Sequence, residues 1–158
     1  MFTDIVSSTN LVEVLGDEAW DHLLRWHDQT LRALFASHGG EEVNRIGDGF
    51  FVAFDRPEPA VRCAVDIQRA LERHRVEHGF APRVRIGVHE AEATQEGSDY
   101  QGRGVHEAAR IAGAAGADEI LVSAPIAVLL EGTAVSEPRG LNLKGFREPV
   151  EVVAVDWH

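Results

Sequence analysis

The sequence predicts an α+β domain in which helices pack on a mostly antiparallel sheet. Two long segments, 17–37 and the one that starts at Pro57, repeat apolar residues at helical spacing. Two β-type runs, 42–46 and 50–54, flank a Gly-Asp-Gly tripeptide that is typical of a hairpin turn. At 158 residues, the chain is long enough for one domain with a substantial core.

In the first half of the chain, the spacing of apolar residues and the helix-capping residues predict one strand and two helices. Residues 1–5 form the first expected strand. Asn10 with Glu13 resembles a capping box, so we expect a short helix to begin at Asn10. Asp17 can cap the long helix that follows, and the glycine pair at 39–40 ends it.

The second half continues with further helices and strands. Pro57 and Pro59 suit the first turn of a helix, because proline lacks an N–H that a helix start leaves unbonded. Polar and glycine-containing residues at 94–102 indicate a loop or a hairpin tip. The other expected elements are strands at 83–89, 119–123, 134–136, 141–143 and 149–155 and helices at 105–115 and 125–130.

The charge balance limits the classes of partner. With 26 acidic and 15 basic residues, the formal net charge is −11, which opposes binding along the phosphate backbone of DNA or RNA. A single nucleotide remains compatible with this charge, since metal ions can neutralise its phosphates. Lys144 is the only lysine, so a role that needs a lysine has one candidate.

Neither a membrane segment nor a disulfide is expected. No apolar run approaches the length that spans a bilayer, and the first residues lack the layout of a signal peptide. The single cysteine, Cys63, excludes an internal disulfide, fits a reducing cytoplasm and is expected to fill the core. Because the first strand begins at the first residue, we expect a domain of a longer protein, with a further domain attached upstream.

Asp4 and Asp48 are the strongest candidates for chemistry. Two carboxylates delivered from the ends of strands can converge on Mg²⁺, which prefers oxygen ligands and retains waters and phosphates. The small polar run 6–10 leads into a helix, where free backbone N–H groups can bind a phosphate. Taken alone, an aspartate in a Gly-Asp-Gly turn is usually turn chemistry. The two aspartates together indicate metal-assisted chemistry on a nucleotide.

Five segments carry motifs: FTDIVSST at 2–9, IGDGF at 46–50, VHEAARI at 105–111, EILVS at 119–123 and LKGF at 143–146. In this order and spacing they resemble the class III adenylyl and guanylyl cyclase catalytic domain. The resemblance covers essentially the whole chain and is strongest to bacterial homodimeric members, including the mycobacterial kind. It implies a ferredoxin-like core and an adenylate cyclase, a lyase that forms cyclic AMP and pyrophosphate from ATP. It also implies a homodimer with its active sites at the interface.

The resemblance assigns one half of the site to the start of the chain. It implies that two Mg²⁺ or Mn²⁺ ions are held by Asp4, by Asp48 and by the carbonyl of Ile5. The ions would activate the ribose 3′-hydroxyl for in-line attack on the α-phosphorus. The N–H groups of Ser8 and Thr9 would hold the terminal phosphates at the helix start.

The resemblance assigns the other half of each site to the partner subunit. Arg110 would stabilise charge at the α-phosphate, and a guanidinium suits this role because it stays charged. His106 stands where the family has an asparagine that orients the ribose. Lys144 falls where the family often carries a lysine that reaches the triphosphate.

Base recognition departs most from the family pattern. Where adenylyl cyclases of the family carry a lysine that donates to the adenine ring, this chain has Asn44. The acidic companion of that lysine is present as Asp99, which can accept from the adenine 6-amino group. Half of the pair is retained, so we expect ATP as the preferred substrate with weaker rejection of GTP.

A second function stays open. The changes at Asn44 and His106 are compatible with a degenerate cyclase domain that binds nucleotide, or only dimerises, and regulates an attached domain. Retention of Asp4, Asp48 and Arg110 counts against it, because a module that only dimerises has no need of convergent carboxylates.

Several aromatic residues and histidines are expected to have structural roles only. Trp20 and Trp26 are expected to pack in the core or at an interface. His27, His74 and His78 form no cluster typical of a metal site, and we expect them on the surface.

Overall fold

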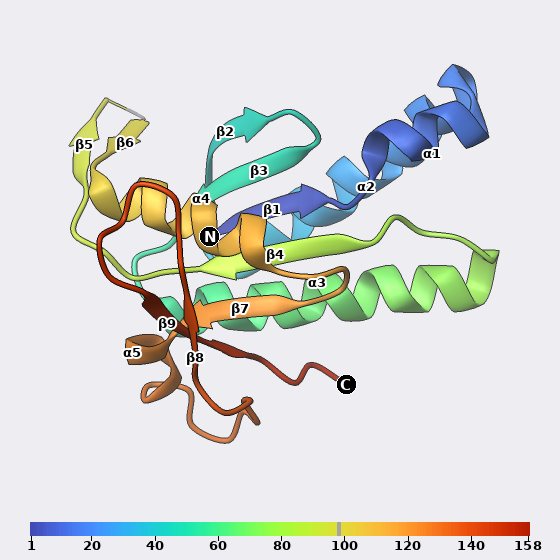
Figure 1. Cartoon of the computed structure of the whole chain (residues 1–158). Coiled ribbons are helices and arrows are strands. Elements are labelled where there is room, and N and C mark those ends of the chain that lie inside the picture. Colours follow the sequence, from blue (N-terminus) through green and yellow to red (C-terminus); the bar gives the residue numbers. More distant parts are fainter. Residues whose placement is uncertain (98) are drawn as a thin grey trace.

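The computed structural model describes residues 1–97 and 99–158, and its main feature is one large twisted sheet (Figure 1). Within the described residues this sheet has seven strands in the order β2-β3-β1-β4-β7-β9-β8. All neighbouring strands are antiparallel except β4 and β7, so the predicted α+β fold with a mostly antiparallel sheet is confirmed. The strands are β1 (Phe2–Ile5), β2 (Glu41–Ile46), β3 (Gly49–Ala53), β4 (Val84–Val88), β7 (Ile120–Ser123), β8 (Arg139–Leu141) and β9 (Val150–Ala154).

The first part of the chain forms the expected ferredoxin-like core. Strand β1 leads through helices α1 (Ser8–Leu15) and α2 (Asp17–Ser37) to the β2–β3 hairpin, and α3 (Pro57–His78) then leads to β4. The spatial order β2-β3-β1-β4 places β1 in the middle of this unit, between the hairpin and β4. Residues at the end of β1 therefore have neighbours on both sides.

Helices cover both faces of the sheet because its central strands carry apolar side chains on both faces. In β3, Phe50 and Val52 contribute to the main core with α2 and α3, whereas Phe51 packs in a second cluster with α4 (Arg103–Ala114). Figure 1 shows α4 crossing the face of the sheet opposite to α3. A Cβ atom added to Gly87 of β4 would lie 2.4 Å from the backbone nitrogen of Ala112, so only glycine allows α4 to approach this closely.

The remaining elements lie at the edges. Strands β5 (Thr94–Glu96) and β6 (Asp99–Gln101) form a separate hairpin, in agreement with the expected hairpin tip. Helix α5 (Ala124–Ala127) follows β7. Of the strand expected at 134–136, only an isolated bridge between Val135 and Val155 is present.

The predicted start of α1 is wrong. The helix begins at Ser8, and Ser7 precedes it with a left-handed φ of 58° and no side-chain cap, so Asn10 lies inside the first turn and forms no capping box. The left-handed residue turns the chain directly from β1 into the helix, three residues earlier than a cap at Asn10 would. Asp17 is likewise the first residue of α2, and Gly16 takes the capping position.

Cys63 fills the core as predicted. It is fully buried in α3, and burial raises the pKa of its thiol to about 12. In the part of the chain that the structure describes, no helix has both the length and the apolar composition needed to cross a bilayer.

The histidine prediction holds for His78 but is wrong for His27. His27 is fully buried in α2 and donates or accepts a hydrogen bond through Nδ1, 3.0 Å from Oδ1 of Asp28. His74 is half-buried beneath Trp26, with their ring centroids 3.6 Å apart. Trp20 and Trp26 pack against the main core, as expected.

Candidate functional site

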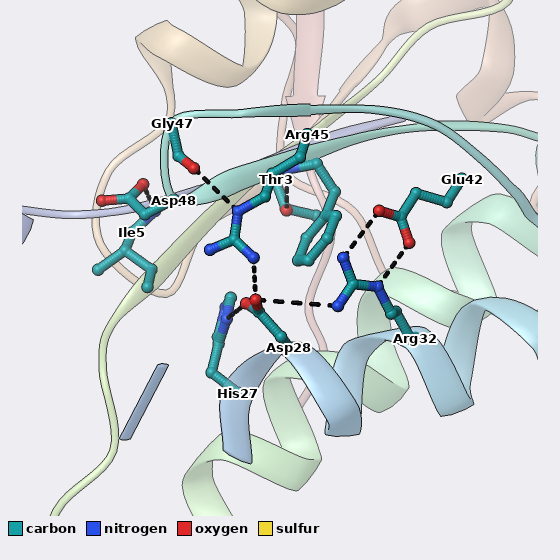
Figure 2. Close-up of polar contacts among 10 residues, drawn as sticks. Thr3, Ile5, His27, Asp28, Arg32, Glu42, Arg45, Gly47 and Asp48 are labelled. Atoms are coloured by element: carbon teal, nitrogen blue, oxygen red, sulfur yellow. Dashed lines mark hydrogen bonds and ion pairs between the residues drawn. The ribbon is translucent and has the colours of Figure 1, made fainter. Parts of the chain in front are cut away.

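Strand pairing brings Asp4 and Asp48 together at the end of β1. The register Thr3↔Phe50 continues to Ile5, whose N–H donates to Oδ1 of Asp48 at 3.3 Å (Figure 2). A Cβ on Gly49 would lie 1.9 Å from the carbonyl oxygen of Thr3, so a glycine after Asp48 allows the hairpin to meet β1 at this point. The two predicted metal-binding carboxylates and the Ile5 backbone are thus neighbours.

The electrostatics of Asp4 fit a cation site. Burial raises the pKa of Asp4, hydrogen bonds from Arg85 oppose that shift, and the nearby carboxylate of Asp48 adds to it. The net effect is a raised pKa, mainly because of burial and in smaller part because the Asp48 carboxylate is near. A divalent cation supplies positive charge that favours the ionised form of such carboxylates.

Arg85 of β4 is a site residue that the sequence analysis missed. Its Nε and Nη2 donate to Oδ2 of Asp4 at 2.8 and 2.5 Å, and its Nη1 donates to the carbonyl of Gly113 at the end of α4 at 3.0 Å. The guanidinium occupies the position of a counter-cation for Asp4. Its only sequence signal is the alternation of β4, which becomes informative once the pairing Asp4↔Arg85 is known.

The start of α1 lies directly after this carboxylate pair. The first N–H that bonds within the helix is that of Leu11, which donates to the Ser7 carbonyl at 3.2 Å. The N–H groups of Ser8 and Thr9 precede it in the first turn and have no intrahelical acceptor. These amides present positive partial charge beside the carboxylate pair, as a phosphate-binding role requires.

The protein ligands available to a metal ion are few. Among the described residues, no group of three or more His, Cys, Asp or Glu side chains is placed to hold one. Asp4, Asp48 and the Ile5 carbonyl would therefore leave most coordination positions to water and to a bound ligand. Mg²⁺ and Mn²⁺ sites that act on phosphates have this character, and the oxygen donors fit such ions.

A second group of predicted residues comes together elsewhere. His106 and Arg110 of α4 line an open cavity of about 700 Å³ with Lys144, which lies in the connection between β8 and β9. Arg103 and Arg147 line the same cavity and were missed by the sequence analysis. The Arg103 guanidinium lies 5.0 Å from the centroid of the Phe146 ring and so links the helix to that connection.

This cationic cavity is unusual in a chain with a net charge of −11. Within the described part of the chain, Arg103, Arg110, Lys144 and Arg147 form no ion pairs. These four cations outnumber Glu148, the one carboxylate among the described lining residues, and so favour a multiply charged anion. The arrangement suits a triphosphate.

The predicted base-reading residues lie on adjacent strands. Asn44 is exposed on β2, and Asp99 is exposed on β6, which lies against β2. Tyr100 meets Phe51, the register partner of Asn44, edge to face with ring centroids 6.4 Å apart. The structure places the two residues on neighbouring elements, and their role in reading a base stays a prediction.

The two groups of residues lie at different ends of the chain. In Figure 1 the β2–β3 turn and the start of α1 lie to the right of the sheet, whereas the connection between β8 and β9 curls over the left-hand part of α4. The cavity that contains Arg110 is lined by none of the residues of the Asp4–Asp48 pair. The carboxylate pair and the cationic cavity are therefore two separate groups of candidate residues on one chain.

A buried ionic network supports the β2–β3 turn (Figure 2). Arg45 of β2 donates to Oδ2 of Asp28 and, through Nε, to the carbonyl of Gly47 at 3.1 Å. Burial by itself raises the pKa of Asp28, but hydrogen bonds from His27 and Arg45 outweigh it and hold the pKa below its usual range. Arg32 joins this network, because its Nη1 lies 3.9 Å from Oδ2 of Asp28 while its Nε and Nη2 donate to the Glu42 carboxylate at 2.7 and 2.9 Å.

Sequence comparison identifies relatives of the chain. A sequence model described as the adenylate and guanylate cyclase catalytic domain matches residues 1–155. An uncharacterized protein of Mycobacterium tuberculosis is 32% identical over 149 residues, which cover 94% of this chain and 38% of that protein. A protein of Lachancea kluyveri named adenylate cyclase is 30% identical over 148 residues, covering 78% of this chain and 8% of that protein. The chain thus spans well under half the length of these relatives.

Structural comparison agrees with the sequence match. An adenylate cyclase of Trypanosoma brucei, solved in its monomeric state, is similar to this chain with a TM-score of 0.85. The match covers 99% of this chain and 87% of that one at 24% sequence identity. At this identity the likeness concerns the fold alone.

Proposed function

The chain belongs to the family of adenylate and guanylate cyclase catalytic domains, and on that premise we propose that it converts ATP to cyclic AMP and pyrophosphate as a homodimer. The observation that carries the proposal is that one chain has a carboxylate pair and, in a different part of the fold, a cationic cavity, which we interpret as the two half-sites of a shared active site. In a two-fold dimer, the carboxylate pair of each chain can meet the cationic cavity of its partner. The dimer would therefore form two equivalent complete sites.

The first half-site would bind the metal ions and the terminal phosphates. Asp4, Asp48 and the Ile5 carbonyl would hold two Mg²⁺ or Mn²⁺ ions, which lower the pKa of the ribose 3′-hydroxyl and neutralise charge on the phosphates. The N–H groups of Ser8 and Thr9 would orient the terminal phosphates. This positioning would align the hydroxyl with the α-phosphorus and the leaving pyrophosphate.

The second half-site would come from the partner subunit. Arg110 would stabilise the charge that develops on the α-phosphate, and Lys144 would bind the triphosphate. His106 would orient the ribose, one helical turn before Arg110. Asn44 and Asp99 would select the base, with ATP preferred over GTP.

A complementation experiment tests the shared site. Asp4→Ala and Arg110→Ala should each abolish formation of cyclic AMP, because each removes one half of both sites. Mixing the two variants should recover about a quarter of the parent activity, since half of the random dimers are heterodimers with one intact site. Absence of recovery, with heterodimers demonstrated by differential tagging, would contradict a shared site. Mixing either variant with itself is the control.

Asn44 and His106 favour a second candidate, a degenerate domain that binds nucleotide and regulates an attached one. Product formation from ATP and from GTP with Mn²⁺, measured at several protein concentrations, separates the two functions. Cyclic AMP that forms faster than in proportion to protein indicates a dimeric cyclase. Nucleotide binding without product, at concentrations where the protein is dimeric, indicates the regulatory module.

We further propose that the domain works in the cytoplasm as part of a longer protein. The support is that Cys63 is a free, buried thiol and that the matched relatives are longer than this chain. The identity of any attached domain determines how the activity is controlled.

A further inference from the structure

Arg45 connects the turn that carries Asp48 to helix α2. Its Nε donates to the carbonyl of Gly47 at 3.1 Å, and its Nη1 donates to Oδ2 of Asp28 (Figure 2). The hydrogen-bonded carbonyl belongs to the residue directly before Asp48. One guanidinium therefore ties the backbone of the turn to a carboxylate on a neighbouring helix.

The helix end of this connection is rigid. The Asp28 side chain is 10% exposed, and its other oxygen lies 3.0 Å from Nδ1 of the fully buried His27. The Arg45 guanidinium also lies 5.4 Å from the ring centroid of Phe50, which is fully buried at the other side of the turn. The Arg45 guanidinium thus meets two buried groups that have little freedom to move.

A β-bulge lets Glu42 and Arg45 both face α2 although Val43 is inserted between them. The register of β2 against β3 shifts between Glu42 and Asn44, so Val43 is the extra residue. In a strand without a bulge, residues three apart face opposite sides of the sheet, yet Glu42 and Arg45 both pair with side chains of α2. The bulge leaves Asn44 facing the opposite side.

We propose that Asp28 and Arg45 are positioning residues that hold the Gly47–Asp48 turn at the distance from β1 at which Asp48 shares a metal ion with Asp4. The inference rests on the proposed function. Mg²⁺ and Mn²⁺ tolerate little variation in ligand distance, so a carboxylate on a turn needs support from behind. Residues that orient metal ligands from behind typically change metal affinity 10- to 100-fold when they are replaced.

Matched substitutions test this role. Asp28→Asn and Arg45→Lys remove the connection with little change in size. Glu42→Gln is the control, because it weakens the ion pair of Glu42 with Arg32, between the same two elements, and leaves Asp28, Arg45 and their contact in place. Arg32 also lies 3.9 Å from Oδ2 of Asp28, so this variant tests whether a neighbouring change in the network is enough to alter the turn. Mn²⁺ binding to each folded protein is measured by electron paramagnetic resonance, in the presence of the non-reacting analogue α,β-methylene-ATP. Melting temperatures are recorded in parallel.

We expect the Mn²⁺ dissociation constant to rise about 10-fold or more in Asp28→Asn and in Arg45→Lys, and to stay within about twofold in Glu42→Gln. The double variant should bind Mn²⁺ no more weakly than the worse single variant, since both act through one connection. Lower melting temperatures with unchanged Mn²⁺ affinity would show a role in stability only and would overturn the inference. An equal loss of affinity in Glu42→Gln would overturn it too. If Asp28→Asn fails to fold, Arg45→Lys decides alone.

The same titration separates this inference from the proposed function. A parent protein that binds Mn²⁺ with the analogue but forms no cyclic nucleotide from ATP contradicts the cyclase proposal and leaves the positioning role to be decided by the variants. A parent that forms cyclic AMP while all variants bind Mn²⁺ equally well contradicts the positioning role alone. A parent that binds no Mn²⁺ contradicts both.

Discussion

At the scale of single residues, Asp4 meets two opposing demands. It must be ionised to bind a metal ion, yet burial and the carboxylate of Asp48 raise its pKa. Two hydrogen bonds from Arg85 to one oxygen of Asp4 partly offset that shift. Both bonds end on Oδ2, so a metal ion in the proposed site would either bind Asp4 through Oδ1 or displace Arg85 from Oδ2.

Metal ions should stabilise the folded protein through Asp4. At a Mn²⁺ concentration of about 100 times its dissociation constant, binding to the folded state alone contributes about 2.7 kcal/mol. We expect a rise in melting temperature that chelation reverses and that Asp4→Asn abolishes. Asp21→Asn, which changes an exposed carboxylate of α2, should retain the rise. A rise of equal size in Asp4→Asn would place the ion elsewhere.

Asn44 should control the choice between ATP and GTP. Asn44→Lys restores the charged donor of family adenylyl cyclases, and the gain of one charge-assisted hydrogen bond is worth about 1–3 kcal/mol. We expect the ratio of kcat/KM for ATP to that for GTP to rise between about 5- and 150-fold. The measurement is cyclic nucleotide formed from each substrate. An unchanged ratio would remove Asn44 from base recognition.

Asp28 should make the free energy of unfolding fall as the pH becomes acidic. Its pKa is held below the usual range, so the unfolded chain binds more protons than the folded one at low pH. Its contribution is complete above the pKa of the unfolded state and is lost as the pH falls from about 5 through the lower pKa of the folded state. Urea titrations at pH 7 and pH 4 should therefore show a smaller loss of stability for Asp28→Asn than for the parent protein. Asp21→Asn should lose as much as the parent.

At the scale of elements, the contact between α4 and β4 decides where the second half-site lies. Ala108, Ile111 and Ala112 are the buried residues of α4, and the opposite side of the helix presents His106 and Arg110. Gly87 allows the close approach of this helix. The position of both candidate residues therefore depends on one glycine in the sheet.

Gly87→Ala should move or loosen α4. Its Cβ would lie 2.4 Å from the Ala112 nitrogen, and overpacking of this kind costs about 1–3 kcal/mol of unfolding free energy. Gly113→Ala is the matched control, because a Cβ there meets nothing within 4 Å. Alanine is favoured over glycine in a helix by up to about 1 kcal/mol, so the control should be as stable as the parent or more so. Urea unfolding measures both, and equal stability of the two variants would contradict the packing argument.

At the scale of the whole molecule, the sequence predicts those features that depend on local patterns of residues, and it misses contacts that depend on how the elements pack. The continuous apolar run of β3 and the helical repeat of α2 and α3 reveal buried faces, and Asp4 and Asp48 stand in recognisable motifs. Arg85 escaped prediction because its contact with Asp4 spans 81 residues and depends on strand order. The buried position of His27 depends in the same way on how α2 docks. The early start of α1 was missed because a left-handed serine is rare.

The bulge at Val43 gives β2 two independent sides. When Val43 is skipped, the side chains before it and after it follow one regular alternation between the two faces of the sheet. Val43 is therefore inserted without changing the face on which any other residue of β2 lies. A strand lacking Val43 would still direct Glu42 and Arg45 toward α2, and would lose only an apolar side chain that packs on the cluster around Phe51 on the other side. The length of β2 can therefore vary by one residue where a base would be read without disturbing the side that anchors the turn. In such a hairpin, the face that contacts a ligand can change while the contacts that anchor the turn to α2 stay the same.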